Sequence, residues 1–282
     1  MAVKKSLRHI MNLYAISAKM DLAWLLRDTK YALAAVLSDT ISNLSVISGV
    51  YLIALRFGGI GGMSVDEVLF MMAYSTITTG IFILFGSGNN LHISRIIGRG
   101  QLEHLFMQPL SLKMQLATSG FVPFTGSGNL IMGCVILAVA IHRLHLEISL
   151  WWVTLFIIYV LTTMVIIVAR SYLVSSAAFY APVAAEEIST AAIEGTWQLS
   201  TFPLSGMPDF IQIPLLTILP EGLMAWFPSL CLLGRPPLHL TEAYPLAYAL
   251  LLALTTNFVF RKGLNDYVRK GSNRYVPYGF RR

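Results

Sequence analysis

Charged residues are scarce in this chain, and their scarcity excludes most soluble folds. Asp, Glu, Lys and Arg make up 12% of the 282 residues, whereas soluble domains carry about a quarter. Hydrophobic residues make up 56%, and the mean hydropathy is +0.67. A soluble globule must cover its surface with polar groups, and a disordered chain is poor in apolar residues. The sequence therefore predicts a polytopic membrane protein.

Cysteine and the common catalytic motifs are also sparse or missing. Cys134 and Cys231 each lie inside an apolar run, which is not typical of a disulfide framework or a metal site. His142 and His145 have only Glu147 near them in sequence, so we expect no metal site. The sequence contains no G-x-x-x-x-G-K-[ST] motif, so this chain cannot hold ATP phosphates in a P-loop. We expect no catalytic residue and no cofactor on this chain.

Long apolar runs are abundant. A helix needs about 20 apolar residues to cross a hydrocarbon core of about 30 Å, and five runs meet that length clearly. Residues 183–233 are ambiguous, because the piece 184–203 carries three glutamates and the piece 210–233 carries three prolines. One of these two pieces must cross if both termini share a side, which gives six spans. The sequence thus predicts an all-α protein with six transmembrane helices.

The distribution of basic residues predicts the orientation. Lys and Arg gather at both termini and between the second and third runs. With the N-terminus inside, only Arg56, Arg143 and Arg235 fall in outer segments, and Arg170 lies at a span end. Because positive charge favours the cytoplasmic side, both termini are expected there. The net charge of +6 then indicates contact with anionic membrane lipid and not with nucleic acid.

The first 30 residues are too polar to cross but are patterned as a helix. One helical face carries Leu7, Ile10, Tyr14, Ala18 and Leu25, and the opposite face is basic. This pattern predicts an amphipathic helix over residues 1–30 that lies in the membrane interface. A helix packed on another subunit is the alternative.

Three ionisable or amide groups at membrane depth are candidates for a transport pathway. Such groups are costly in lipid and usually face protein or water. Asp39 and Asn43 lie four residues apart on one face of the first span, and Glu194 lies midway along residues 184–203. A structural hydrogen bond is the alternative for Asp39.

The cytoplasmic segment after the second run carries a short amphipathic pattern. Gly100 and Pro109 bracket it, and apolar Leu102, Leu105 and Phe106 alternate with polar side chains. A helix of this kind can rest on lipid or dock into a groove of a partner.

Three stretches resemble a known family. Residues 97–111, IGRGQLEHLFMQPLS, resemble the G-x-L-x-x-L-L-x-P-L-S loop of type-2 ATP-binding-cassette (ABC) permeases. Residues 205–208, SGMP, and 218–220, ILP, are similar to the stretch after the family's fifth span. Residues 261–267, RKGLNDY, and 271–275, GSNRY, are similar to one bacterial six-span branch of the exporter permeases.

The resemblance implies an architecture. It makes residues 184–204 the fifth span, so that together with the five apolar runs the expected spans lie at about residues 31–57, 68–88, 119–141, 150–174, 184–204 and 243–261, within a transmembrane domain of residues 31–262. It also implies an outer re-entrant segment at 210–233, a coupling helix at 99–111 and a basic cytoplasmic tail at 263–282. The resemblance further implies location in the bacterial inner (cell) membrane.

The resemblance also implies partners and a role. A cytoplasmic ABC ATPase dimer would bind ATP and Mg, and a second permease, identical or related, would complete the pathway of an exporter. The expected contacts with the ATPase are Arg99, Gln101, Leu102, Glu103, His104, Leu105, Phe106 and Gln108. Gln108 departs from the branch, which often has Arg there, so an ion pair to the ATPase is in doubt at that position.

Two other functions stay open at this stage. An ABC import permease would carry an E-A-A-x-x-x-G loop, which the order of residues 184–188 and Gly195 does not reproduce. An integral-membrane enzyme would need a converging nucleophile, base or metal ligands, and the sequence presents none of these patterns.

Overall fold

The computed structural model describes residues 2–86, 93–118, 120–236 and 241–271. Within these ranges the chain is helical apart from turns, loops and an isolated bridge between Ile60 and Met63. The helices of the first half are α1 (Ala2–Arg27), α2 (Thr29–Phe57), α3 (Val65–Gly86), α4 (Ile93–Gly98), α5 (Leu102–Phe106), α6 (Leu112–Thr118) and α7 (Gly128–Leu144). The helices of the second half are α8 (Leu150–Ser175), η1 (Ser176–Phe179), α9 (Pro182–Leu199), α10 (Asp209–Gln212), α11 (Pro214–Thr217), η2 (Pro220–Leu223), α12 (Trp226–Leu232) and α13 (Tyr244–Lys270).

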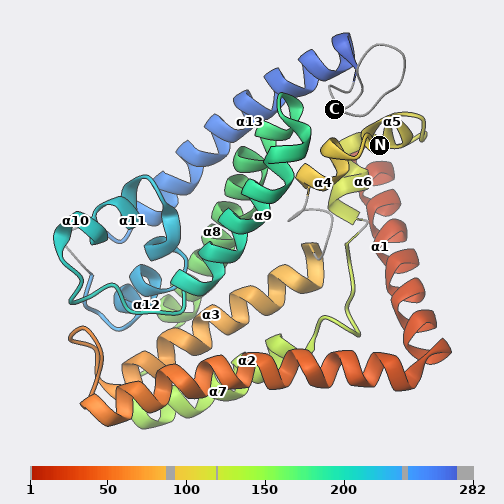
Figure 1. Ribbon diagram of the computed structural model, residues 1–282. Helices are drawn as coiled ribbons and strands as arrows, with labels where there is room; N and C mark the ends of the chain where they lie inside the picture. The colour runs from red at the N-terminus through yellow and green to blue at the C-terminus, as the bar shows by residue number, and fades with distance from the viewer. Residues whose placement is uncertain (1, 87–92, 119, 237–240, 272–282) are drawn as a thin grey trace.

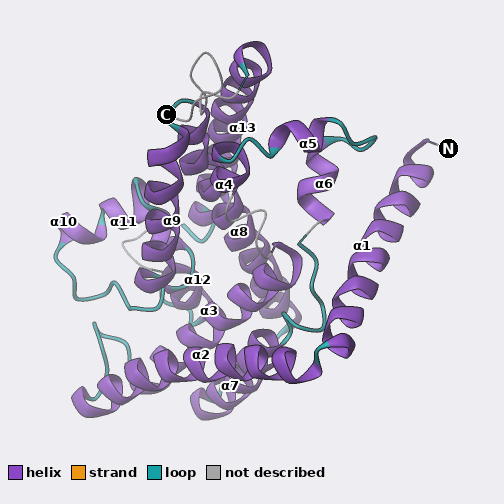
Figure 2. Cartoon of the chain, turned by 45° about the vertical axis from the view of Figure 1, so that its right-hand side comes forward, coloured by secondary structure: helices purple, strands orange, loops and turns teal. Residues whose placement is uncertain are grey.

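The long helices form two arms (Figure 1). One arm contains α2, α3 and α7, and the other contains α8, α9 and α13. The arms meet at the end that carries α10 to α12, here called the α12 end. They diverge toward the opposite end, here called the α5 end, where α4, α5 and α6 lie. In Figure 2 the helix α1 stands apart from the second arm and joins the end of α2 at a sharp corner.

Helices α3 and α7 pack closely because glycine lies at their contact. A Cβ at Gly80 would lie 2.5 Å from the backbone nitrogen of Leu130, and one at Gly133 would lie 2.8 Å from the backbone nitrogen of Ile77. Real Cβ atoms do not approach backbone so closely. Small residues let helix backbones approach in membranes, where no hydrophobic effect drives association. We call this contact the glycine seam.

Among the residues that the structure describes, three helices are long and apolar enough to cross a membrane: Thr29–Phe57, Val65–Phe85 and Leu150–Phe179. A pair of helices bent by 71°, Asp209–Thr217 with Pro220–Leu232, would count as a fourth if it were one span. The chain is thus an all-α polytopic membrane protein. The count of six spans stays a prediction, because α7 has 17 residues and α13 carries charge in its last turns.

The two largest differences from the boundaries expected from the sequence are at the third apolar helix and at the last helix. The third apolar helix begins at Gly128 and not at residue 119, because Pro123 and neighbouring turns interrupt the preceding segment. The carboxylate of Asp21 holds that segment in place and accepts hydrogen bonds from the backbone nitrogens of Phe124 and Thr125, at 2.8 and 3.2 Å. At the other end of the chain, α13 continues to Lys270, so the first residues of the expected tail are helical.

The bent segment α10 to α12 starts and finishes at the same end of the molecule (Figure 1). The prolines at 214 and 220 open α11 and η2, where their missing N–H groups break no helical hydrogen bond. This arrangement fits the expected re-entrant segment, and the re-entrant assignment stays a prediction.

Two apolar clusters hold the helices together. The larger lies toward the α12 end and includes the fully buried Phe70, Tyr74, Tyr159, Trp226 and Phe227. The smaller lies at the α5 end, where residues of α4, α5, α6, η1 and α13 converge. The residues of this smaller cluster position α5, the expected coupling segment.

Candidate pathway cavity and coupling segment

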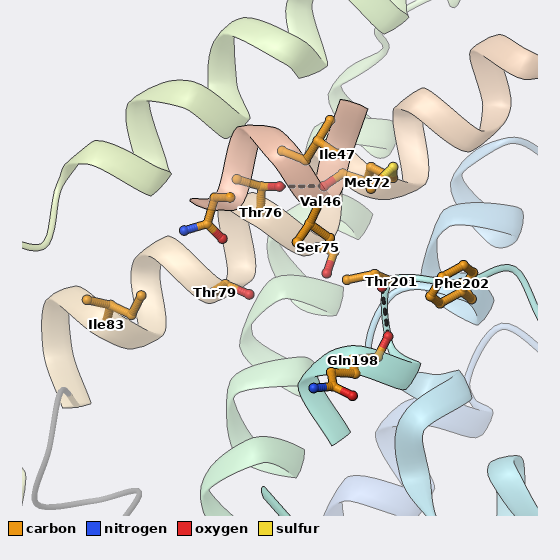
Figure 3. A pocket seen from close by; sticks show the side chains of 11 residues that line it. Val46, Ile47, Met72, Ser75, Thr76, Thr79, Ile83, Gln198, Thr201 and Phe202 are labelled. Atoms are coloured by element: carbon orange, nitrogen blue, oxygen red, sulfur yellow. Dashed lines mark hydrogen bonds between the residues drawn. The ribbon is translucent and has the colours of Figure 1, made fainter. Parts of the chain in front are cut away.

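A cavity of about 640 Å³ lies between α2, α3 and the end of α9, with side chains from all three elements around it (Figure 3). We call it the pathway cavity. Its lining residues are Asn43, Val46, Ile47, Met72, Ser75, Thr76, Thr79, Ile83, Gln198, Thr201 and Phe202. The lining therefore combines apolar side chains with uncharged hydroxyl and amide groups.

Several polar atoms in this lining are already bonded within their own segments. The hydroxyl of Thr76 donates to the Met72 carbonyl at 2.8 Å, and that of Thr201 donates to the Gln198 carbonyl at 2.7 Å (Figure 3). The side-chain amide of Asn43 donates to the Asp39 carbonyl at 2.8 Å. The cavity therefore offers a mostly apolar wall with a few acceptor atoms, which suits an amphiphilic molecule.

Of the three residues expected to line a pathway, the structure places only one in the pathway cavity. Asn43 lines the cavity, whereas Asp39 and Glu194 are exposed and do not line it. Glu194 lies one turn before Gln198, which does line it. Sequence reasoning missed the hydroxyl stripe of α3, although Ser75, Thr76 and Thr79 recur at helical spacing inside an apolar run.

The expected coupling segment forms a short helix, α5, on the smaller apolar cluster. Leu102 is fully buried and Leu105 is partly buried against the same cluster, so these two side chains point inward. Phe106 and Met107 are 43% and 74% exposed and are the apolar groups that a partner could reach. The exposed polar side chains here are those of Arg99, Gln101, Glu103, His104 and Gln108.

Polar contacts brace α5 from two neighbouring helices. The amide nitrogen of Gln115 in α6 donates to the carbonyls of Leu105 and Leu110, each at 2.8 Å. The hydroxyl of Tyr267 in α13 donates to the carboxylate of Glu103 at 3.5 Å. These contacts join α5 to α6 and to α13.

The segment α10 to α12 is bonded along the length of α8. The indole nitrogen of Trp152 donates to the Leu232 carbonyl at 3.0 Å, and the Thr163 hydroxyl donates to the Met224 carbonyl at 3.3 Å. Deeper along α8, Arg170 forms a buried ion pair with Glu221. Trp152 and Arg170 are about 27 Å apart along the helix at 1.5 Å per residue.

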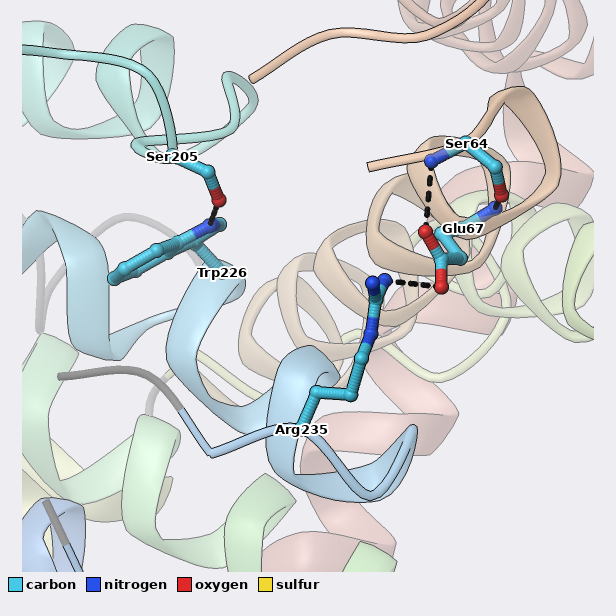
Figure 4. A network of polar contacts seen from close by, with 5 residues as sticks. All are labelled: Ser64, Glu67, Ser205, Trp226 and Arg235. Carbon is cyan, nitrogen blue, oxygen red and sulfur yellow. Dashed lines mark hydrogen bonds and ion pairs between the residues drawn. The ribbon is translucent and has the colours of Figure 1, made fainter. Parts of the chain in front are cut away.

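The α12 end is closed by contacts to the start of α3. Ser64 and Glu67 form a capping box, in which the backbone nitrogen of each residue donates to the other's side chain, at 2.7 and 3.3 Å (Figure 4). Arg235, which follows α12, pairs with the same Glu67 (Figure 4). The indole of Trp226 donates to the Ser205 hydroxyl at 2.7 Å (Figure 4).

A second cation reaches the start of α3 from α7. Arg143 lies 3.4 Å from the carboxylate of Asp66 and donates to the Tyr51 hydroxyl at 2.8 Å. These hydrogen bonds, that to Tyr51 first, raise the pKa of the Arg143 guanidinium. Among the residues that the structure describes, no group of three or more His, Cys, Asp or Glu side chains could hold a metal ion.

Comparison with known proteins gives one match. The profile of a family described as "ABC-2 family transporter protein" matches residues 41–271. These residues include both sides of the pathway cavity, α5 and the segment α10 to α12. Searches of curated proteins and of solved structures gave no match.

Proposed function

Because the chain belongs to the ABC-2 family of transporter proteins, we propose that it is a permease subunit of an ABC exporter. Membership of the family makes it a membrane permease component of an ABC transporter. The proposal adds the direction of transport, which is export, and the position of the chain in the bacterial inner membrane with both termini in the cytoplasm. ATP and Mg would bind to a separate ATPase and not to this chain.

The contacts that hold α5 against α6 and α13 support the part of this proposal that concerns coupling to the ATPase. A coupling segment must present a contact surface to the ATPase and transmit its movement to the spans. The exposed Phe106 and Met107 provide an apolar contact, and the exposed Glu103, His104 and Gln108 would surround it with polar groups. The contacts from Gln115 and Tyr267 would transmit the movement. Each copy of the chain, or its related partner, would engage one ATPase of a dimer.

The pathway cavity supports an amphiphilic substrate. Its wall has no charged side chain among the residues that line it, so the substrate would not be selected by charge. It opens between the two arms, where a second permease could complete its wall. An import permease is the weaker alternative, because residues 184–188 and Gly195 lack the order of the importers' loop.

The coupling half is tested by changing Phe106 and Met107 together to alanine. Truncation of a central apolar contact typically costs about 2 kcal/mol or more, so capture of the ATPase should fall at least about 30-fold. The assay is co-purification of a co-expressed ABC ATPase and its stimulated ATP hydrolysis in liposomes. Phe57→Ala is the matched control, because Phe57 is exposed at the far end of α2. Equal capture by the double variant and the control would contradict the coupling assignment.

The pathway half is tested in the same liposomes with Thr79→Trp, which fills the cavity. Transport of a fluorescent amphiphile should fall while ATPase capture is retained. Leu52→Trp, on the exposed face of α2 away from the cavity, should leave both unchanged. If Thr79→Trp transports as well as Leu52→Trp, the cavity is not on the pathway.

A further inference from the structure

A larger cavity, of about 820 Å³, lies on another face of α3 from the pathway cavity. We call it the lateral groove. Its walls come from α1, α3, α6, α8 and α13, and its volume is within the range of about 300–1,000 Å³ typical of small-molecule sites. Most of its wall is apolar, including Phe82, Phe85, Val165, Val168, Phe260 and Leu264.

The polar groups of the lateral groove are arranged in order along α13. Ala253, Asn257 and Arg261 line the groove at intervals of four residues, so they share one helix face at steps of about 6 Å. Moving from the α5 end, the groove therefore presents a cation, then an amide and then apolar carbon. Arg261 and Asn257 are both exposed. In the described part of the chain, no carboxylate forms an ion pair with Arg261.

This order matches the chemistry of one class of molecule. A phospholipid presents a phosphate, then glycerol ester carbonyls and then acyl chains along its length. Arg261 could bind the phosphate, and the amide of Asn257 could donate to an ester carbonyl. The α5 end also carries the exposed cations Arg269 and Lys270, and such basic surfaces attract anionic lipid.

Helix α1 closes one side of the same groove. Tyr14 lines the groove and packs edge-on against Phe85 and Phe121, with ring centroids 6.3 and 5.0 Å apart. An acyl chain in the groove would therefore contact α1 on one side and the arm of α8 and α13 on the other.

We propose that the lateral groove binds one anionic phospholipid of the leaflet next to the α5 end, with its phosphate at Arg261 and its acyl chains between α3 and α8. The inference depends on the membrane orientation proposed above, with the α5 end at the cytoplasmic surface. It does not depend on the transport activity, the ATPase or the direction of transport.

The test is native mass spectrometry of the purified chain in detergent with added phosphatidylglycerol or phosphatidylcholine of identical acyl chains. Wild-type protein should retain phosphatidylglycerol in preference to phosphatidylcholine. Arg261→Gln should reduce that preference about fivefold, which is the effect of one basic residue near an anionic surface. Lys262→Gln is the matched control, because it removes a charge from the next position of α13 outside the groove. It should keep the preference.

A second variant tests the acyl part of the site. Val165 lines the groove and is exposed, so Val165→Trp should fold and should lower retention of both lipids. Equal lipid preference in the Arg261 and Lys262 variants would overturn the proposal, as would unchanged retention in Val165→Trp. Because the measurement needs no ATPase and no transport, a failure here leaves the proposed function separately testable.

Discussion

Replacing Glu221 by glutamine should strongly destabilise the protein, because it leaves a buried cation without its counter-charge. The side chains of Arg170 and Glu221 are only 10% and 2% exposed, so water cannot solvate the guanidinium after the change. Breaking one partner of such a buried pair typically costs about 3–5 kcal/mol. Glutamine keeps the shape of the side chain, so the loss reports charge and not packing.

The matched control is a pair of the same chemistry at the surface. Arg143 and Asp66 are 48% and 36% exposed, and exposed pairs contribute only about 0–1 kcal/mol. Asp66→Asn should therefore cost no more than about 1 kcal/mol. The double change Arg170→Met with Glu221→Met should recover most of the loss, because apolar replacement of a buried pair is often neutral or stabilising.

The free energy of unfolding can be measured in mixed micelles with a rising fraction of SDS, followed by tryptophan fluorescence. The reasoning would be refuted if Glu221→Gln and Asp66→Asn cost the same. It would also be refuted if the double methionine variant were as unstable as Glu221→Gln, because the buried charge would then not be the cause.

Two further predictions concern the α12 end and the orientation of the chain. Gly61 has φ +58° and a Cβ there would overlap the Ser205 carbonyl, whereas Gly62 has φ +75° and open space. Both alanine variants incur the left-handed penalty of about 1–2 kcal/mol. Gly61→Ala should lose more thermal stability than Gly62→Ala, because only Gly61 lies against the Ser205 carbonyl. Equal losses would contradict that contact. For orientation, a cysteine introduced at Ser64 should react with an impermeant thiol reagent in intact cells, and one at Ser272 should not. The reverse labelling pattern would overturn the assignment of both termini to the cytoplasm.

The class of the protein and the order of its helices follow from the sequence, because apolar length and proline position are local properties. The two leucines of α5 show where that reasoning stops. Leu102 and Leu105 fit an outward apolar edge by spacing, but residues as distant as Tyr267 cover them. The same limit separates Asn43 from Asp39, since the approach of α3 and of the end of α9 places Asn43, and not Asp39, in a cavity.

The glycine seam determines which parts of the molecule can move. The backbones of α3 and α7 lie in close contact at Gly80 and Gly133, so sliding would drive backbone into backbone, and we expect the two helices to turn as one rigid body. Relative motion is then left to the boundary between this body and the arm of α8, α9 and α13. Both the pathway cavity and the lateral groove lie on that boundary. A single rotation would therefore change the volumes of both cavities in the same step, and occupancy of one would bias the shape of the other.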